Sequence, residues 1–159
     1  MIEIIRADLT NPKHAEALVN LMREYALDPM GGGKELPEKV LTNLAAELHK
    51  RQGAHVILAF KDKQAIGLVN CIEGFSTFAC QPLLNIHDAI VTKAYRGQGI
   101  LQKLFAEAEQ IAKENGCCKL TLEVLEGNLS AQKAYLKFGF SGYELDPKMG
   151  KALFWEKGL

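Results

Sequence analysis

The hydrophobic period of this chain changes repeatedly between two residues and about 3.6 residues, and the order of these changes constrains the fold most strongly. Alternating apolar positions predict strands at residues 2–7, 55–60, 65–74, 83–92, 119–125 and 152–159. Helical spacing predicts one helix before the break at 28–33, one between Pro37 and Gly53, one from Leu101 to Gly116 and one between Asn128 and Gly139. This order predicts an α/β sandwich whose mixed, mostly antiparallel sheet is flanked by helices.

Length and charge narrow the class of protein. A chain of 159 residues with no repeat, linker or low-complexity run indicates a single domain over residues 1–159. Lys plus Arg and Asp plus Glu are both 19, without blocks of like charge, so no broad nucleic-acid-binding face is expected. No segment approaches the roughly 18 consecutive apolar residues of a membrane span. We therefore expect a soluble, cytoplasmic protein that binds neither nucleic acid nor membrane.

The cysteines give no sign of a metal or redox site. Cys71, Cys80, Cys117 and Cys118 form no CxxC pair, and the adjacent pair is an unfavourable disulfide. We interpret all four as reduced packing residues and expect no metal.

A glycine-rich loop follows the strand predicted at 83–92 and leads into the third helix. Its sequence, AYRGQGIL, occupies residues 94–101. Glycines let a ligand approach the main chain, and the first amides of a helix lack partners within the helix. Such a loop favours a phosphate, although by itself it is equally consistent with a simple turn.

Two familiar phosphate-binding folds do not match this loop. A Rossmann site requires a third glycine where the chain has Gln102, and it follows the first strand rather than a late one. A P-loop requires GxxxxGK followed by Ser or Thr, and the chain has no such string. The sequence therefore carries no nucleoside triphosphatase signature.

The stretch IHDAIVTKAYRGQGILQKLF resembles the acyl-CoA-binding segment of the Gcn5-related N-acetyltransferases, the GNAT family. Arg96 and Gly99 match the family motif, whereas Leu101 stands where the motif has Gly or Ala. A second stretch, EGNLSAQKAYLKFGF, is similar to a downstream motif of the family; the matching residues are Asn128, Ala131, Tyr135, Gly139 and Phe140. The predicted order of elements also resembles the family fold.

The resemblance implies acetyl-CoA as cosubstrate, with no metal. The pyrophosphate would bind the amides of the glycine loop, formed by Arg96, Gly97, Gln98, Gly99, Ile100 and Leu101. The pantetheine arm would pair with the preceding strand at Ala89, Ile90 and Val91 as an added strand, and Asn128 would orient it. The family separates two parallel strands at this point, which here are those at 83–92 and 119–125.

The implied reaction is direct attack of a primary amine on the thioester in a ternary complex. Tyr135 is then the general acid for the departing thiolate, and its alternative role is a core aromatic. His87 is the first candidate for the base, with a hydrogen-bonded structural histidine equally favoured, and Glu73 is the second candidate, with a solvated carboxylate favoured. Asp88, on the opposite strand face from His87, is interpreted as structural.

The acceptor is predicted only as a class. In the family it enters near segments that correspond to residues 27–35 and 74–80, where Phe75 and Phe78 suggest an apolar wall. The leading interpretation is an N-acetyltransferase for a small-molecule amine. The alternatives are a protein or peptide N-acetyltransferase and a non-catalytic acyl-CoA-binding sensor. A homodimer stays open at this stage.

Overall fold

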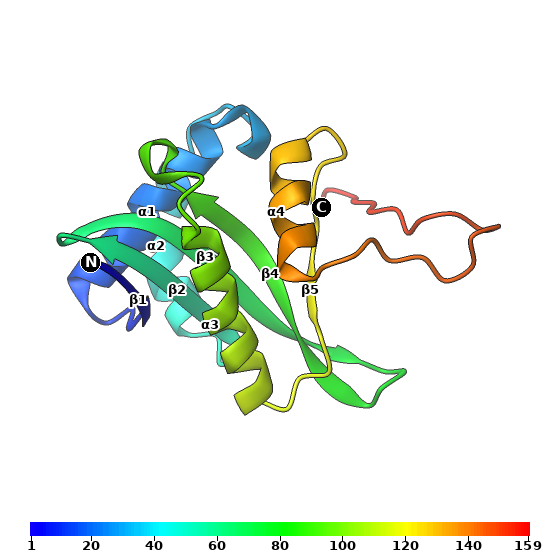
Figure 1. The fold of residues 1–159 in the computed structure, drawn as a ribbon. Coiled ribbons are helices and arrows are strands. Elements are labelled where there is room, and N and C mark those ends of the chain that lie inside the picture. The colour runs from blue at the N-terminus through cyan, green and yellow to red at the C-terminus, as the bar shows by residue number, and fades with distance from the viewer.

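The computed structural model describes residues 1–159 as five strands and four α-helices, together with single 3₁₀ turns at Pro29–Gly31 and Lys93–Tyr95. In chain order they are β1 (Ile2–Arg6), α1 (Pro12–Leu27), α2 (Glu38–His49), β2 (Ala54–Lys61), β3 (Gln64–Ser76), β4 (Gln81–Val91), α3 (Ile100–Glu114), β5 (Leu120–Leu122) and α4 (Leu129–Phe138) (Figure 1). The sheet order is β1-β2-β3-β4-β5, antiparallel except for the parallel pair β4–β5. The predicted mixed sheet with flanking helices is confirmed.

The sheet forms a middle layer with a hydrophobic core on each face. On one face the strands pack against the apolar stripe of α3, centred on the fully buried Phe105. On the other face they pack against α1, through Leu18 and Leu21, and against one side of α2. Both sheet faces are thus covered, which explains why the central strands β2 and β3 contain nearly continuous apolar runs.

The ends of α3 and α4 follow from local chemistry that the sequence displays. Asn128 caps α4, because its side-chain oxygen accepts a hydrogen bond from the Ala131 N–H at 3.2 Å. Gly139 ends the same helix in the left-handed conformation, with φ at 114°. Gly99 adopts φ of 75° directly before α3 begins. The predicted boundaries of α4 at Asn128 and Gly139 are confirmed, and α3 begins at Ile100, one residue before the predicted Leu101.

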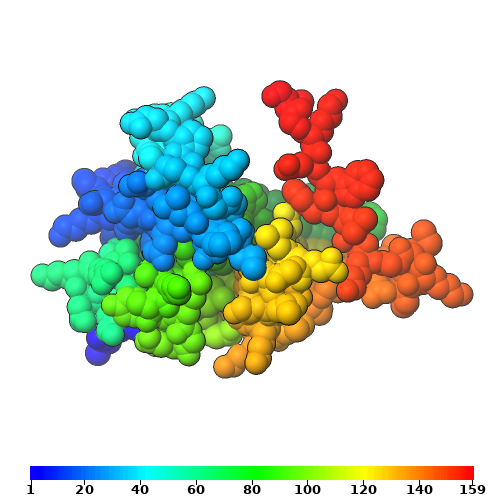
Figure 2. Space-filling view, turned by 90° about the horizontal axis from the view of Figure 1, so that it is seen from above, coloured from blue at the N-terminus to red at the C-terminus, as the bar shows by residue number.

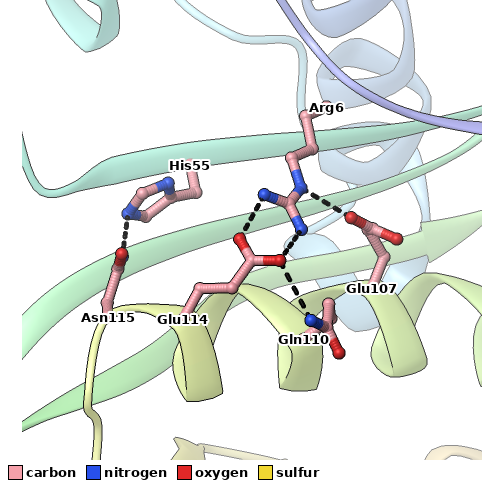
Figure 3. Close-up of polar contacts among 6 residues, drawn as sticks. All are labelled: Arg6, His55, Glu107, Gln110, Glu114 and Asn115. Carbon is pink, nitrogen blue, oxygen red and sulfur yellow. Dashed lines mark hydrogen bonds and ion pairs between the residues drawn. The ribbon is translucent and has the colours of Figure 1, made fainter.

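A charged cluster fastens the N-terminal strand to α3. Arg6 on β1 donates to Glu107 at 2.6 Å through Nε, and to both oxygens of Glu114 at 2.6 and 3.0 Å (Figure 3). Gln110 donates to Glu114 at 3.0 Å, one turn earlier on the helix. Hydrogen bonding to Arg6 lowers the pKa of Glu114 to about 2. The cluster therefore holds two elements that lie 108 residues apart in the sequence.

The predicted strand at residues 152–159 is wrong. The segment after α4 contains only one isolated antiparallel bridge, between Glu144 and Lys151, and every residue from 152 to the end is exposed. The strand predicted at 119–125 is also shorter and is limited to Leu120–Leu122. An apolar pattern shows that a segment suits a sheet, but a strand forms only where a neighbouring strand pairs with it, and residues 152–159 have no such neighbour within the chain.

The exposure of the four cysteines differs from the sequence prediction at two positions. Cys71 is buried and burial raises its pKa to about 12, as a packing residue requires, and Cys117 is partly buried. Cys80 and Cys118 are exposed, so their interpretation as packing residues is wrong. None of the helices has the length and apolar character needed to cross a lipid bilayer. No three His, Cys, Asp or Glu side chains gather in a way that could hold a metal ion.

Candidate active site

A cavity of about 330 Å³ lies where four segments meet: the end of α1, the last residues of β4, the glycine loop before α3, and one side of α4. Figure 2 shows the yellow-orange α4 segment beside the blue connection after α1 and the light-green glycine loop. The cavity brings together nearly all of the predicted cofactor-binding residues, namely Ala89, Ile90, Val91, Arg96, Gly97, Gly99, Ile100, Leu101 and Asn128, and it also includes Tyr135. Gln98 does not line the cavity. Its side-chain amide donates a hydrogen bond to the Ala94 carbonyl at 3.4 Å.

The glycine loop presents a run of unpaired amides to this cavity. The N–H groups of residues 97 to 102 donate to no backbone acceptor, and the first bond after them runs from Lys103 to Gly99 at 3.3 Å. Gly97 and Gly99 have φ of 77° and 75°, and a side chain added at either would meet nothing within 4 Å. The loop therefore offers an open cradle of donors at the positive end of α3, which fits the pyrophosphate of acetyl-CoA.

Arg96 is exposed, but its guanidinium is held by two contacts that link the loop to neighbouring segments. Its Nε donates to the Val91 carbonyl at 2.9 Å, and its Nη2 contacts the Asp28 carboxylate at 3.1 Å. Asp28 also accepts from the Met30 N–H, and this bond followed by the one from Arg96 lowers the pKa of Asp28. The guanidinium thus links the glycine loop to the turn after α1 across the mouth of the cavity.

Strand β4 loses its neighbour β5 just before the cavity. The parallel pairing stops at Ile86 opposite Leu122, while pairing of β4 with β3 continues to Val91. Because the Thr92 N–H bonds β3 at Ile66, the alternation of an antiparallel ladder directs Ile90 toward β3 as well. Ala89 and Val91 then direct their backbone groups to the open edge. This edge can pair with an extended amide chain such as pantetheine.

Tyr135 is held against the cavity by an aromatic cluster. Its ring centroid lies 5.5 Å from that of Phe105, which also contacts Phe138 at 5.4 Å and Phe140 at 5.7 Å. Gln102 adds a hydrogen bond from α3 to the Ala134 carbonyl at 3.0 Å. Burial raises the pKa of the Tyr135 phenol, with a smaller effect from Tyr25. The phenol therefore keeps its proton at neutral pH.

A β-bulge changes the arrangement around His87. Asn70 is opposite Asp88 and Cys71 is opposite Ile86, so His87 is the extra residue and is exposed. Ile86 and Ala89 both contact the α3-side core, with two residues between them. The bulge interrupts the period of two between Ile86 and Ala89, so the regular alternation from which opposite faces were predicted for His87 and Asp88 does not apply here.

Asp88 belongs to a polar group on the α1 side of the sheet. Its carboxylate accepts a hydrogen bond from the Asn70 amide at 2.9 Å, and Asn70 also contacts the Met22 sulfur at 3.3 Å. Asn70 is buried and its carbonyl oxygen has no partner. Burial, followed by the charges of Asp88 and Asp28, raises the pKa of Tyr25, which lines the cavity.

Four residues that the sequence suggested for the site do not line the cavity, namely His87, Glu73, Phe75 and Phe78. Glu73 is opposite Leu84, five residues before Ala89, or about 16 Å along the strand at about 3.3 Å per residue. It is exposed and adjoins Gly53. Phe75 and Phe78, at the tip of the β3–β4 hairpin, are exposed and do not line the cavity.

The cavity also contains residues that sequence reasoning missed. Tyr25, Ser130 and Lys137 line it and were not proposed, whereas Asp28 and Met30 belong to the segment 27–35 that was predicted near the acceptor. Tyr25 shares the helical spacing of Leu18 and Leu21 in the first predicted helix, and no sequence signal separates it from those apolar residues. Lys137 follows the predicted acid Tyr135 by two positions, and only the docking of α4 brings it to the cavity.

Comparison with known proteins agrees with this geometry. A model of the acetyltransferase (GNAT) family matches residues 15–140. A thialysine N-epsilon-acetyltransferase of Caenorhabditis elegans is 25% identical over 127 residues, which cover 78% of this chain and 75% of the relative. A streptothricin acetyltransferase of Streptomyces lavendulae is 35% identical over 85 residues, 52% of this chain and 45% of that protein. The solved structure of the aminoglycoside acetyltransferase AAC(6')-Iy, in complex with a bisubstrate analogue of CoA, has a TM-score of 0.79 at 18% identity, covering 100% of this chain and 99% of that one. The chain belongs to the GNAT family of acetyltransferases.

Proposed function

We propose that this protein transfers the acetyl group of acetyl-CoA to the primary amine of a small molecule, directly and within a ternary complex. One observation carries the proposal: a single cavity joins the unpaired amides of the glycine loop, the open edge of β4 and Tyr135. Those three features suit the pyrophosphate, the pantetheine arm and the thioester of one molecule.

Different parts of the cavity bind the pyrophosphate and the pantetheine arm of acetyl-CoA. The amides of residues 97–102 hold the pyrophosphate, and the backbone groups of Ala89 and Val91 pair with the pantetheine amides. The Val91 carbonyl already accepts from Arg96, which leaves its N–H for the ligand. Asn128 caps α4 at the cavity wall and aligns the arm.

The chemistry requires the ammonium to lose two protons and the thiolate to gain one. A primary amine with an ordinary pKa of about 10.4 must lose its first proton, to the base, before it attacks, at a cost of about 4–5 kcal/mol at neutral pH. The neutral amine then adds to the thioester carbonyl, and the thiolate takes the phenolic proton of Tyr135 as the C–S bond breaks. The nitrogen loses its second proton in the same step, and this proton restores the phenol. The position of Tyr135 in the cavity supports this role, and its phenol is protonated at neutral pH.

The base is proposed among side chains near the bulge of β4. His87 remains the first candidate, since it lies two residues before Ala89. The adjoining Asp88 is an additional candidate, because its carboxylate is close enough to cavity-lining Tyr25 to raise that pKa. The distance of Glu73 from Ala89 argues against the second candidate from the sequence.

A small-molecule amine is the acceptor class that the relatives favour. The charges of the cavity do not select it, because Asp28 is paired with Arg96 and Lys137 also lines the cavity. The relatives support this class, since their names specify thialysine, streptothricin and aminoglycoside as substrates.

A panel of acceptors tests the proposal. The full chain with acetyl-CoA is offered lysine-like amines, an aminoglycoside, a streptothricin and peptides with free N-termini, and release of CoA thiol is measured. We expect turnover with at least one small amine and none with the same compounds after N-acylation. Turnover of peptides alone would indicate a protein acetyltransferase, whereas binding of acetyl-CoA without any turnover would indicate a sensor.

A further inference from the structure

Neither candidate base lies in the wall of the cavity. The amine would lose its first proton next to the thioester, inside the cavity, yet His87 and Asp88 do not line it. His87 is exposed, and Asp88 accepts a hydrogen bond from Asn70 at 2.9 Å on the α1 side of the sheet. A group in the cavity wall that both accepts and releases a proton would connect the amine to the base, and a neutral hydroxyl has both capacities.

Most titratable groups in the cavity wall already have another partner or role. These groups are Tyr25, Asp28, Tyr95, Arg96, Tyr135 and Lys137. Asp28 is paired with Arg96 at 3.1 Å, and charged Arg and Lys side chains have no lone pair for a proton. Tyr135 is the proposed acid for the thiolate, and the Tyr95 hydroxyl contacts the first residue of β3 at 3.4 Å. Tyr25 is the remaining group.

Tyr25 lies beside Asp88 because α1 covers the polar group that contains this carboxylate. Met22, one turn before Tyr25 on α1, contacts the Asn70 amide through its sulfur at 3.3 Å. The same amide donates to Asp88, which is opposite Asn70 in the pairing of β3 with β4. Burial, followed by the charge of Asp88, raises the pKa of the Tyr25 phenol, which agrees with a short separation between the two groups.

The titratable groups around Tyr25 and Asp88 come from four segments. Asp88 takes part in no ion pair, whereas Asp28, the other carboxylate near Tyr25, is held by the bridge to the glycine loop. Tyr135 faces Tyr25 from α4. On β3 the buried Cys71 thiol is near Asp88, and burial followed by that charge raises the pKa of Cys71 to about 12. Asp88 is therefore the carboxylate near Tyr25 that no cation engages.

Asn70 directs the Asp88 carboxylate and leaves one of its own atoms unpaired. Because its amide N–H faces the carboxylate, its carbonyl oxygen is buried without a partner. Turning the amide over would place this oxygen against the carboxylate and the Met22 sulfur, which are both acceptors. A buried unsatisfied polar group in a native protein requires an explanation, and holding Asp88 toward Tyr25 provides one.

We propose that Tyr25 relays the first proton of the acceptor amine out of the cavity, toward Asp88 and the bulge of β4. An N–H bond of the ammonium breaks and its proton joins the phenol oxygen, while the phenol's own proton passes to the base beside the bulge. The nitrogen keeps the electron pair with which it attacks the thioester, and Tyr25 ends the step as a neutral phenol. The base returns the proton to solvent after the products leave. The relay rests on the proposed acetyl transfer and adds the route by which the amine becomes reactive.

Acceptor amines of different basicity test the relay, because an amine that is already neutral does not need it. A basic amine that the parent acetylates is compared at neutral pH with an analogue fluorinated beside the amino group, whose amine is mostly neutral at that pH. Release of CoA thiol by the full chain is measured. We expect Tyr25→Phe to lower kcat by about 10² with the basic amine and by less than about threefold with the analogue. Tyr135→Phe should lower kcat with both, because the thiolate leaves in either reaction.

The pH and a second substitution provide further readouts. With the basic amine, the deficit of Tyr25→Phe should shrink as the pH rises toward the pKa of the amine, since more of the amine arrives neutral. Tyr25→Phe is also combined with His87→Gln or Asp88→Asn, whichever of the two lowers turnover. The double variant should lose no more than the larger single loss, because residues of one proton route act as a unit.

Tyr95→Phe is the matched control, because it removes a hydroxyl from the same cavity wall whose partner is on β3. It should keep the parent's ratio of turnover between the two amines. An unchanged shift of the melting temperature with acetyl-CoA establishes that Tyr25→Phe keeps a folded site.

The outcomes separate the relay from the proposed function. Full turnover of the basic amine by Tyr25→Phe would overturn the relay. An equal loss with both amines would overturn it as well and would make Tyr25 a binding residue, and additive losses in the double variant would contradict a shared route. A parent that turns over no amine would instead overturn the proposed function, and the relay with it.

Discussion

The hydroxyl group of Tyr135 is the only part of that side chain that the acid role requires. The ring packs against Phe105 and Phe140 and supports α4 whether or not catalysis occurs. Tyr135→Phe keeps the ring and removes the proton donor. We expect turnover to fall by about 10² or more while the affinity for acetyl-CoA stays nearly unchanged. Steady-state kinetics and a binding titration measure both, and full turnover in the variant would leave Tyr135 as a core residue only.

The identity of the base is accessible from pH profiles of turnover efficiency. We expect His87→Gln to lower the plateau by about 10² to 10⁴ and to remove the acid limb, while Glu73→Gln is mild because of its distance from the cavity. If Asp88→Asn instead removes the fall in turnover efficiency at low pH, the Asp88 carboxylate, which accepts a hydrogen bond from Asn70, is the base. Unchanged profiles in all three variants would mean that the amine loses its proton to water, and that catalysis depends on positioning and on Tyr135.

The positions of Tyr135 and Asn128 were predictable because each is set by a local pattern within one short helix. Asn128 caps that helix and Gly139 ends it, so the spacing between them fixes which face carries the tyrosine. The surroundings of His87 were not predictable in this way. They depend on a bulge, and a bulge arises from the register between β4 and β3 rather than from either strand alone.

At the level of the elements, the glycine loop is the feature that a single substitution tests most directly. Without ligand, Gly99→Val costs about 1–3 kcal/mol because φ of 75° is strained for valine. Its side chain would also occupy the space through which a phosphate reaches the amides. We therefore expect saturating acetyl-CoA, at 100 times its Kd, to stabilise the parent by about 2.7 kcal/mol and this variant not at all. Thermal melts with and without ligand measure the difference.

Gly116 provides the matched control for this experiment. It has φ of 69° after α3, equally open surroundings and no contact with the cavity. Gly116→Val should lower the melting temperature by a similar amount yet keep the full shift with acetyl-CoA. An equal loss of the shift in both variants would trace the effect to general destabilisation rather than to the cradle.

The glycine loop was predictable from the sequence, whereas the absence of a strand at residues 152–159 was not. Unpaired amides and left-handed glycines are properties of a short stretch, so residues 97–102 could be interpreted from the sequence. Whether residues 152–159 form a strand depends on which edge of the sheet is free to pair with them. The free edge belongs to β5, and this strand covers Leu120–Leu122 rather than the predicted 119–125. Pairing between distant segments is decided by the assembled sheet.

At the scale of the whole molecule, acid stability should report the attachment of β1 to α3. The pKa of Glu114 is lowered from its ordinary 4.5 to about 2, so the contact with Arg6 stabilises the fold fully above pH 4.5. That contribution is lost as the pH falls from 4.5 toward 2. We expect Glu114→Gln to lower the melting temperature slightly at neutral pH, with the gap to the parent closing over this range. Glu3→Gln changes a carboxylate that lies on β1, like Arg6, but has no ion-pair partner, and it should show no such gap.

The bridge from Arg96 to Asp28 has a consequence for the order of events in a catalytic cycle. Arg96 belongs to the loop proposed to receive acetyl-CoA; its Nε is held by the Val91 carbonyl at the end of β4, and its Nη2 contacts Asp28 in the turn proposed to lie near the amine. A ligand that tightens either loop therefore constrains the other, and such an influence must be equal in both directions. Acetyl-CoA should then raise the affinity for the amine by the same factor as the amine raises the affinity for acetyl-CoA. Removing the bridge would leave the two substrates binding independently, in random order.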